Sequence, residues 1–74
     1  MNMRYLVVLE KGPTSCGAFV PDIPGCIAVG GSEAEATALI QDAIQLHLED
    51  LHRGGKPIPE AVSKSTFVEI GLAG

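Results

Sequence analysis

The sequence has few of the features that mark membrane proteins, exported proteins or nucleic-acid-binding proteins. No apolar run approaches the roughly 20 residues that cross a bilayer, and no apolar segment with a cleavage site opens the chain. Nine acidic residues against five basic ones give a net charge of -4, and the basic residues form no stripe. Direct binding to nucleic-acid phosphates is therefore disfavoured. We expect a cytoplasmic protein whose acidic surface suits a basic partner or simply confers solubility.

Motifs for catalysis and metal binding are also missing from the sequence. The only side chains that could act as bases near neutral pH are His47 and His52, and no cluster of Asp, Glu, His or Cys has metal-ligand spacing. No second cysteine pair and no histidine at metal-ligand spacing lies near Cys16 and Cys26. We therefore interpret both as reduced thiols in the core, with a disulfide or a reactive thiol as the alternative. We expect no enzyme activity, no cofactor and no bound metal.

Aromatic residues are scarce, with no tryptophan, one tyrosine and two phenylalanines. A chain of this length hides only roughly 60% of the surface of its unfolded form, so the core must be thin. A hydrophobic fraction of 46% and a mean hydropathy of +0.27 are nevertheless too apolar for a disordered chain. We therefore expect a single domain over residues 1–74 that associates into a homo-oligomer, most simply a two-fold dimer.

The residue pattern predicts three short strands followed by one long helix. Residues that favour β-structure fill positions 4–10, 16–20 and 26–30, and turn-forming residues separate these runs. Ser32 and Glu35 have the spacing of a capping box, in which the serine oxygen accepts from the Glu35 N–H and the glutamate reaches back to the serine N–H. The helix should begin at Glu33 and end near Arg53, with Gly54 as a left-handed C-cap.

One side of the expected helix is apolar and should pack on the sheet. At 100° per residue, His47 falls near the centre of this side. It is either a neutral imidazole that is hydrogen-bonded within the fold, or part of a helix face left open for a partner. The apolar residues of this side are Ala36, Leu39, Ile40, Ala43, Ile44, Leu46, Leu48 and Leu51.

A fourth strand is expected after the helix. Residues 56–59 form a stiff return segment with two prolines, and residues 66–70 then alternate in the manner of a strand with one buried face. The expected fold class is α+β in the order β-β-β-α-β: a three-stranded meander, one long helix packed on the sheet, and a fourth strand.

The most distinctive segment lies between the second and third expected strands. It reads Pro21, Asp22, Ile23, Pro24, Gly25 and Cys26, preceded by residues 17–20 and followed by Gly30, Ser32, Glu35, Ala36, Ala43 and Ile44. This order resembles the signature of HicB-type antitoxins of toxin–antitoxin systems, and the resemblance covers nearly the whole chain. It implies a partly RNase-H-like fold without catalytic carboxylates.

The resemblance also implies a function, which is to neutralise a small basic toxin of the HicA type that cleaves messenger RNA, by masking its RNA-binding surface. We expect Glu10, Phe19, Asp22 and His47 to contact this partner. HicB proteins of this type usually continue into a DNA-binding domain, whereas this sequence stops at Gly74, so we expect weak or no DNA binding. Two alternatives stay open: a structural oligomeric module without a toxin partner, and a small stand-alone hydrolase that uses His47 or Cys26.

Overall fold

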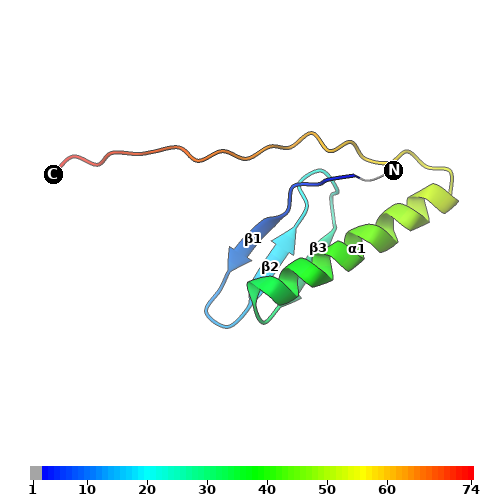
Figure 1. Ribbon diagram of the computed structural model, residues 1–74, viewed down its shortest axis with the longest axis horizontal. Helices are drawn as coiled ribbons and strands as arrows, with labels where there is room; N and C mark the ends of the chain where they lie inside the picture. The colour runs from blue at the N-terminus through cyan, green and yellow to red at the C-terminus, as the bar shows by residue number, and fades with distance from the viewer. Residues whose placement is uncertain (1–2) are drawn as a thin grey trace.

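Three short strands and one long helix are the regular elements of the computed structural model, which describes residues 3–74. The strands pair antiparallel in the order β1-β2-β3, and α1 packs across one face of the sheet (Figure 1). The expected meander, helix and α+β class are confirmed. The bounds are Val8–Lys11 for β1, Cys16–Phe19 for β2, Ile27–Gly30 for β3 and Glu33–Arg53 for α1. No helix within residues 3–74 combines the length and the apolar character that a membrane crossing requires.

Two consecutive β-turns connect β2 to β3 and account for the proline-rich signature. The N–H of Ile23 donates to the Val20 carbonyl at 3.1 Å, and the N–H of Cys26 donates to the Ile23 carbonyl at 3.1 Å. Pro24 and Gly25 occupy the central positions of the second turn, and Gly25 has the positive φ of 83° that a type II turn requires at its third residue. The signature therefore reverses the chain while it buries the side chains of Ile23 and Cys26 in the core.

The core lies between the sheet and α1 and is built largely of small side chains. Ala18 of β2 lies opposite Ala28 of β3, and Gly30 ends β3 beside the start of the helix. A Cβ atom on Gly30 would lie 2.7 Å from the Ala36 nitrogen, so only glycine allows this approach. The buried apolar side chains are those of Cys16, Ala18, Val20, Ile23, Cys26, Ala36 and Ile40, and Gly30 is buried beside them. Both cysteines are unpaired core side chains, as the sequence indicated.

Both ends of α1 are capped, although two details differ from expectation. The Glu35 N–H donates to Ser32 Oγ at 3.1 Å, as a capping box requires. The Glu35 carboxylate, however, accepts from the N–H of Gly31 at 2.8 Å rather than from Ser32. At the other end Gly54 has φ of -81°, and Gly55 is the residue with the left-handed φ of 67°. The prediction for Gly54 was therefore wrong by one residue, because the last helical turn continues through it.

His47 is exposed rather than central to the packed side of α1, which corrects the sequence-based expectation. A helix of 21 residues is about 32 Å long, whereas a strand of four residues spans about 13 Å. The C-terminal half of α1 therefore extends beyond the strands (Figure 1), and the sheet cannot cover it. Leu39 and Leu46 lie on the flank of the helix and are exposed as well.

Residues 56–74, called the tail here, are extended and contain no helix or strand. The tail passes the N-terminal segment and continues past the sheet (Figure 1), which contributes to a longest dimension of 57 Å. The expected fourth strand over residues 66–70 is not formed within the described chain. These residues have the extended conformation that their pattern favours, but they lie beside no sheet edge that could supply hydrogen-bond partners.

Candidate protein-binding surface

The face of the sheet that α1 does not cover is apolar and exposed to solvent. Strand register decides which residues it carries, because Ala18 and Ala28 face the helix and their neighbours must point the other way. Ile27 and Val29 are 68% and 64% exposed, which is unusual for β-branched residues in a sheet. The open face, as we call it, carries Val8, Glu10, Phe19, Ile27 and Val29.

A shallow hollow lies in the middle of the open face. Gly17 pairs with Glu10 on one side and with Val29 on the other, and its missing side chain leaves a depression of about 220 Å³. Phe19 and Ile27 line the same depression. An apolar floor with a carboxylate at its edge is suited to an aliphatic or aromatic side chain from a partner that also carries positive charge.

The four residues that we expected to contact a partner lie in three different places. Glu10 and Phe19 lie together on the open face. His47 lies exposed on α1, and Asp22 lies in the turns between β2 and β3. Their contact with a partner stays a prediction, but only Glu10 and Phe19 share a surface. The sequence analysis missed Ile27 and Val29, although a strand with apolar residues in successive positions indicates a sheet with two apolar faces.

Asp22 holds the tail against the body of the protein. Its carboxylate accepts from the backbone N–H groups of Val62 at 3.0 Å and Ser63 at 2.9 Å, and from the Ser63 hydroxyl at 2.7 Å. The bonds from Ser63, followed by that from Val62, lower the pKa of Asp22 below its ordinary value. The Tyr5 hydroxyl donates to the Pro59 carbonyl at 2.5 Å. We call these contacts the tail anchor, and no local sequence signal could have shown them because the partners lie 40 or more residues apart.

The Tyr5 hydroxyl is perturbed by the same surroundings. Burial raises the pKa of Tyr5, and the nearby negative charge of Asp22 raises this pKa further. Both effects favour the neutral phenol, which can donate to Pro59. The N-terminal segment, residues 3–7, is thereby tied to the beginning of the tail.

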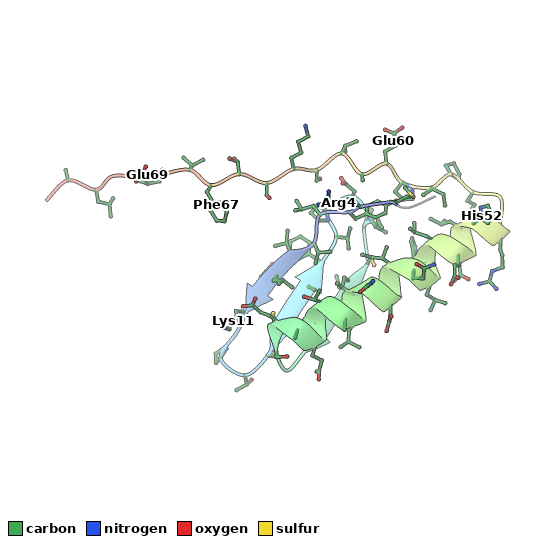
Figure 2. The ribbon with its side chains drawn as sticks, viewed as in Figure 1. Arg4, Lys11, His52, Glu60, Phe67 and Glu69 are labelled. Atoms are coloured by element: carbon green, nitrogen blue, oxygen red, sulfur yellow. The ribbon has the colours of Figure 1, made fainter. Side chains whose placement is uncertain are left out.

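A second hollow, which we call the helix groove, lies between the N-terminal segment and the overhanging half of α1. Its volume is about 1180 Å³. Its apolar lining comes from Tyr5, Val7, Ile40, Ile44, Leu48 and Ile58. Its polar lining comes from Arg4, Thr37, Gln41, Gln45, Glu49, His52 and Arg53. Figure 2 shows Arg4 and His52 on the two elements that border the groove, the N-terminal segment and the end of α1.

The chemistry of the described residues gives little support to the hydrolase alternative. Burial raises the pKa of Cys26, so its thiol is less ionised and a weaker nucleophile at neutral pH than an ordinary cysteine. His47 lies exposed on α1, whereas Cys26 lies in the core. Within residues 3–74, no group of three or more His, Cys, Asp or Glu side chains is placed to hold a metal ion.

Comparison with known proteins finds one matching family model and several related proteins. A family model described as "HicB_like antitoxin of bacterial toxin-antitoxin system" matches residues 5–69. Antitoxin HicB 2 of Photorhabdus laumondii is 34% identical over 70 residues, which are 93% of this chain and 50% of that protein. An uncharacterized 14.9 kDa protein of Haemophilus phage HP1 is 30% identical over 59 residues, 80% of this chain and 44% of that protein.

A UPF0150 protein of Helicobacter pylori is 46% identical over 49 residues, which are 66% of this chain and 68% of that protein. The chain therefore spans about half the length of the Photorhabdus and phage relatives and a larger share of the Helicobacter one. No solved structure shows a significant match.

Proposed function

The chain belongs to the HicB-like antitoxins of bacterial toxin–antitoxin systems, and we propose that it neutralises a small basic mRNA-cleaving toxin of the HicA type by binding it through the open face. The family supports an antitoxin role, which is regulatory rather than enzymatic. The proposal places this activity in the cytoplasm, where messenger RNA is available to the toxin.

The observation that carries the proposal is the exposure of Ile27 and Val29 beside the Gly17 hollow. Apolar surface contributes about 25 cal/mol per Å² when it is covered, and α1 already occupies the other face of the sheet. The carboxylate of Glu10 and the net charge of -4 favour a basic partner over an acidic one. Together these features give the open face an apolar centre and a negative charge that is complementary to a basic toxin.

The proposal includes a homodimer and a partly RNase-H-like fold in which a fourth strand joins the sheet. A chain with a core of seven buried apolar side chains among those described gains stability from a second copy by mass action. If the chain instead serves as a structural module without a toxin, the open face would have only another copy to bind. The experiment below separates these two functions.

The test uses the small basic protein encoded beside the gene of this chain. The toxin's cleavage of messenger RNA is measured with rising amounts of the purified chain. We expect stoichiometric inhibition by the unmodified chain, and a loss of affinity of at least roughly 30-fold for Val29→Arg, the size of a hot-spot effect. An arginine there fills the hollow with a charge of the same sign as the partner.

The matched control is Leu46→Arg, which adds the same charge at a comparably exposed position of α1. It should inhibit as well as the unmodified chain. Equal inhibition by both variants would refute binding through the open face. Absence of any inhibition by the unmodified chain would refute neutralisation of this toxin.

A further inference from the structure

Two extended segments of the described chain make no backbone–backbone hydrogen bonds to other described residues. Outside the helix and strands, the backbone hydrogen bonds within residues 3–74 involve neither the N-terminal segment, residues 3–7, nor residues 64–74. Residues 64–74 are all exposed, so their N–H and C=O groups are open to solvent and available to a neighbouring strand. Both segments are therefore suited to become strands once another chain lies beside them.

The N-terminal segment offers an acceptor edge for such a strand. It continues directly into β1, and β1 is an edge strand because the sheet order is β1-β2-β3. The helix groove lies alongside it, lined by Ile44 and Leu48 of α1. A strand added to this edge would place every second side chain in the groove, as in β-strand addition between chains.

Residues 66–72 have the composition of the missing strand. In an extended strand Val68, Ile70 and Leu72 lie on one side and Phe67 and Glu69 on the other. Their exposure in the isolated chain is 73% for Val68, 74% for Ile70 and 94% for Leu72. Phe67 is 104% exposed, and Figure 2 shows it on the part of the tail that has passed beyond the sheet.

We propose that residues 66–72 of one copy add as a strand to the N-terminal segment of a second copy, with Val68, Ile70 and Leu72 in its helix groove. The tail anchor holds residues 59–63 beside the N-terminal segment of their own copy, and the chain then leaves the body. A tail that leaves its own body in this way is free to enter the groove of a second copy. Each copy supplies one donor strand and one acceptor groove, so a reciprocal exchange between two copies closes at a dimer.

This inference specifies the homodimer of the proposed function, yet it uses neither the open face nor a toxin. It is therefore tested with the purified chain alone, and its failure would leave toxin neutralisation untouched. The mass in solution is measured by light scattering during size exclusion at 50 to 100 µM. We expect twice the 7.7 kDa of one chain.

The decisive variant is Ile70→Asp, which places a charge on the donor side of the tail. Because Ile70 is largely exposed in the isolated chain, the change should leave the fold intact while the mass falls to that of a monomer. Leu46→Asp is the control, with the same kind of change at an exposed position of α1, and should remain dimeric. A monomeric unmodified chain, or a dimer that survives Ile70→Asp, would overturn the proposal.

A second experiment identifies which copy fills each groove. A photo-crosslinking amino acid replaces Val68, and equal amounts of ¹⁴N-labelled and ¹⁵N-labelled chains are mixed, exchanged and irradiated. Mass spectrometry should find crosslinks to α1 in which the two peptides carry different isotopes. Crosslinks that join only peptides of the same isotope would show that the tail fills its own groove, and crosslinks to β3 would place it on the open face. Both results contradict the proposal.

Discussion

Ile40 in α1 and Phe67 in the tail are both large apolar residues, yet Ile40 is 1% exposed and Phe67 is 104% exposed. The difference arises from what lies opposite each residue. Ile40 faces a sheet whose small side chains let the helix approach, whereas Phe67 follows an anchor that directs the chain away from every surface of its own body. Burial in this protein therefore depends on a partner surface more than on hydrophobicity.

The same contrast separates the two faces of the sheet. Ala18 on the covered face is 3% exposed, whereas Ile27 on the open face is 68% exposed. The small side chains lie inside and several large ones lie outside, the reverse of the usual distribution in a small domain. Apolar surface arranged in this way is typical of an interaction site. On the sheet, the covered face therefore carries mainly small side chains and the open face carries larger apolar ones.

The largest expected effect comes from comparing truncation of Ile40 in the core with truncation of Phe67 in the tail. Ile40→Ala should lower the free energy of unfolding by about 2–5 kcal/mol because it leaves a cavity in the core. Phe67→Ala should change it by less than about 0.5 kcal/mol at concentrations where the chain is monomeric. Urea unfolding followed by circular dichroism measures both. A comparable loss for the two variants would show that the tail packs on its own body.

A second test concerns the contact between β3 and the start of α1. Gly30→Ala should cost about 1–3 kcal/mol, because the added Cβ would lie 2.7 Å from the Ala36 nitrogen and the helix would have to move. Gly31→Ala is the control, since its nearest neighbour is the Glu35 carboxylate at 3.7 Å. In thermal unfolding, the melting temperature of Gly30→Ala should therefore be clearly lower than that of Gly31→Ala. Equal melting temperatures would contradict the close packing described here.

A third test removes the N-terminal cap of α1, which should lower the free energy of unfolding by a smaller amount. Ser32→Ala removes the acceptor for the Glu35 N–H and should cost about 1 kcal/mol. Ser65→Ala makes the same change in the tail, where the side chain is exposed, and should be neutral. Denaturant unfolding of both variants gives the comparison. A neutral Ser32→Ala would show that another group replaces the serine oxygen.

The sequence predicted those features that depend on neighbours close in the chain. The Pro24-Gly25 turn, the Ser32 cap and the three strand segments are set by local conformational preferences, and all are present, although β1 covers Val8–Lys11 rather than the predicted residues 4–10. The exposure of His47 was missed, although the predicted lengths of the helix and the strands already implied that the end of α1 would extend beyond the sheet. Two of the five residues of the open face were found, Glu10 and Phe19, whereas Val8, Ile27 and Val29 were missed.

The smallest expected effect concerns the anchor that joins body and tail, and it depends on pH. Hydrogen bonds from Ser63 and Val62 lower the pKa of Asp22, so the folded state prefers the carboxylate. The contribution of Asp22 is therefore complete above the pKa of about 3.9 that an unfolded aspartate has, and it is lost as the pH falls through the lower pKa of the folded state. Tyr5 behaves in the opposite sense, because its pKa is raised and its bond to Pro59 is lost only as the pH rises through that value.

The amide signals of Val62 and Ser63 report on this anchor by nuclear magnetic resonance. From pH 7 to pH 5 they should keep their positions and their protection from exchange, and both should change together in strongly acidic solution while the signal of Ala18 in β2 stays unchanged. Asp22→Asn removes the charge but keeps the shape, so the protection of both amides should be low at neutral pH and should not titrate in acid. Midpoints at or above the ordinary aspartate pKa would contradict the anchor, because they would mean that folding does not favour the carboxylate. Since the anchor lies outside the core, its loss should free the tail without unfolding the body.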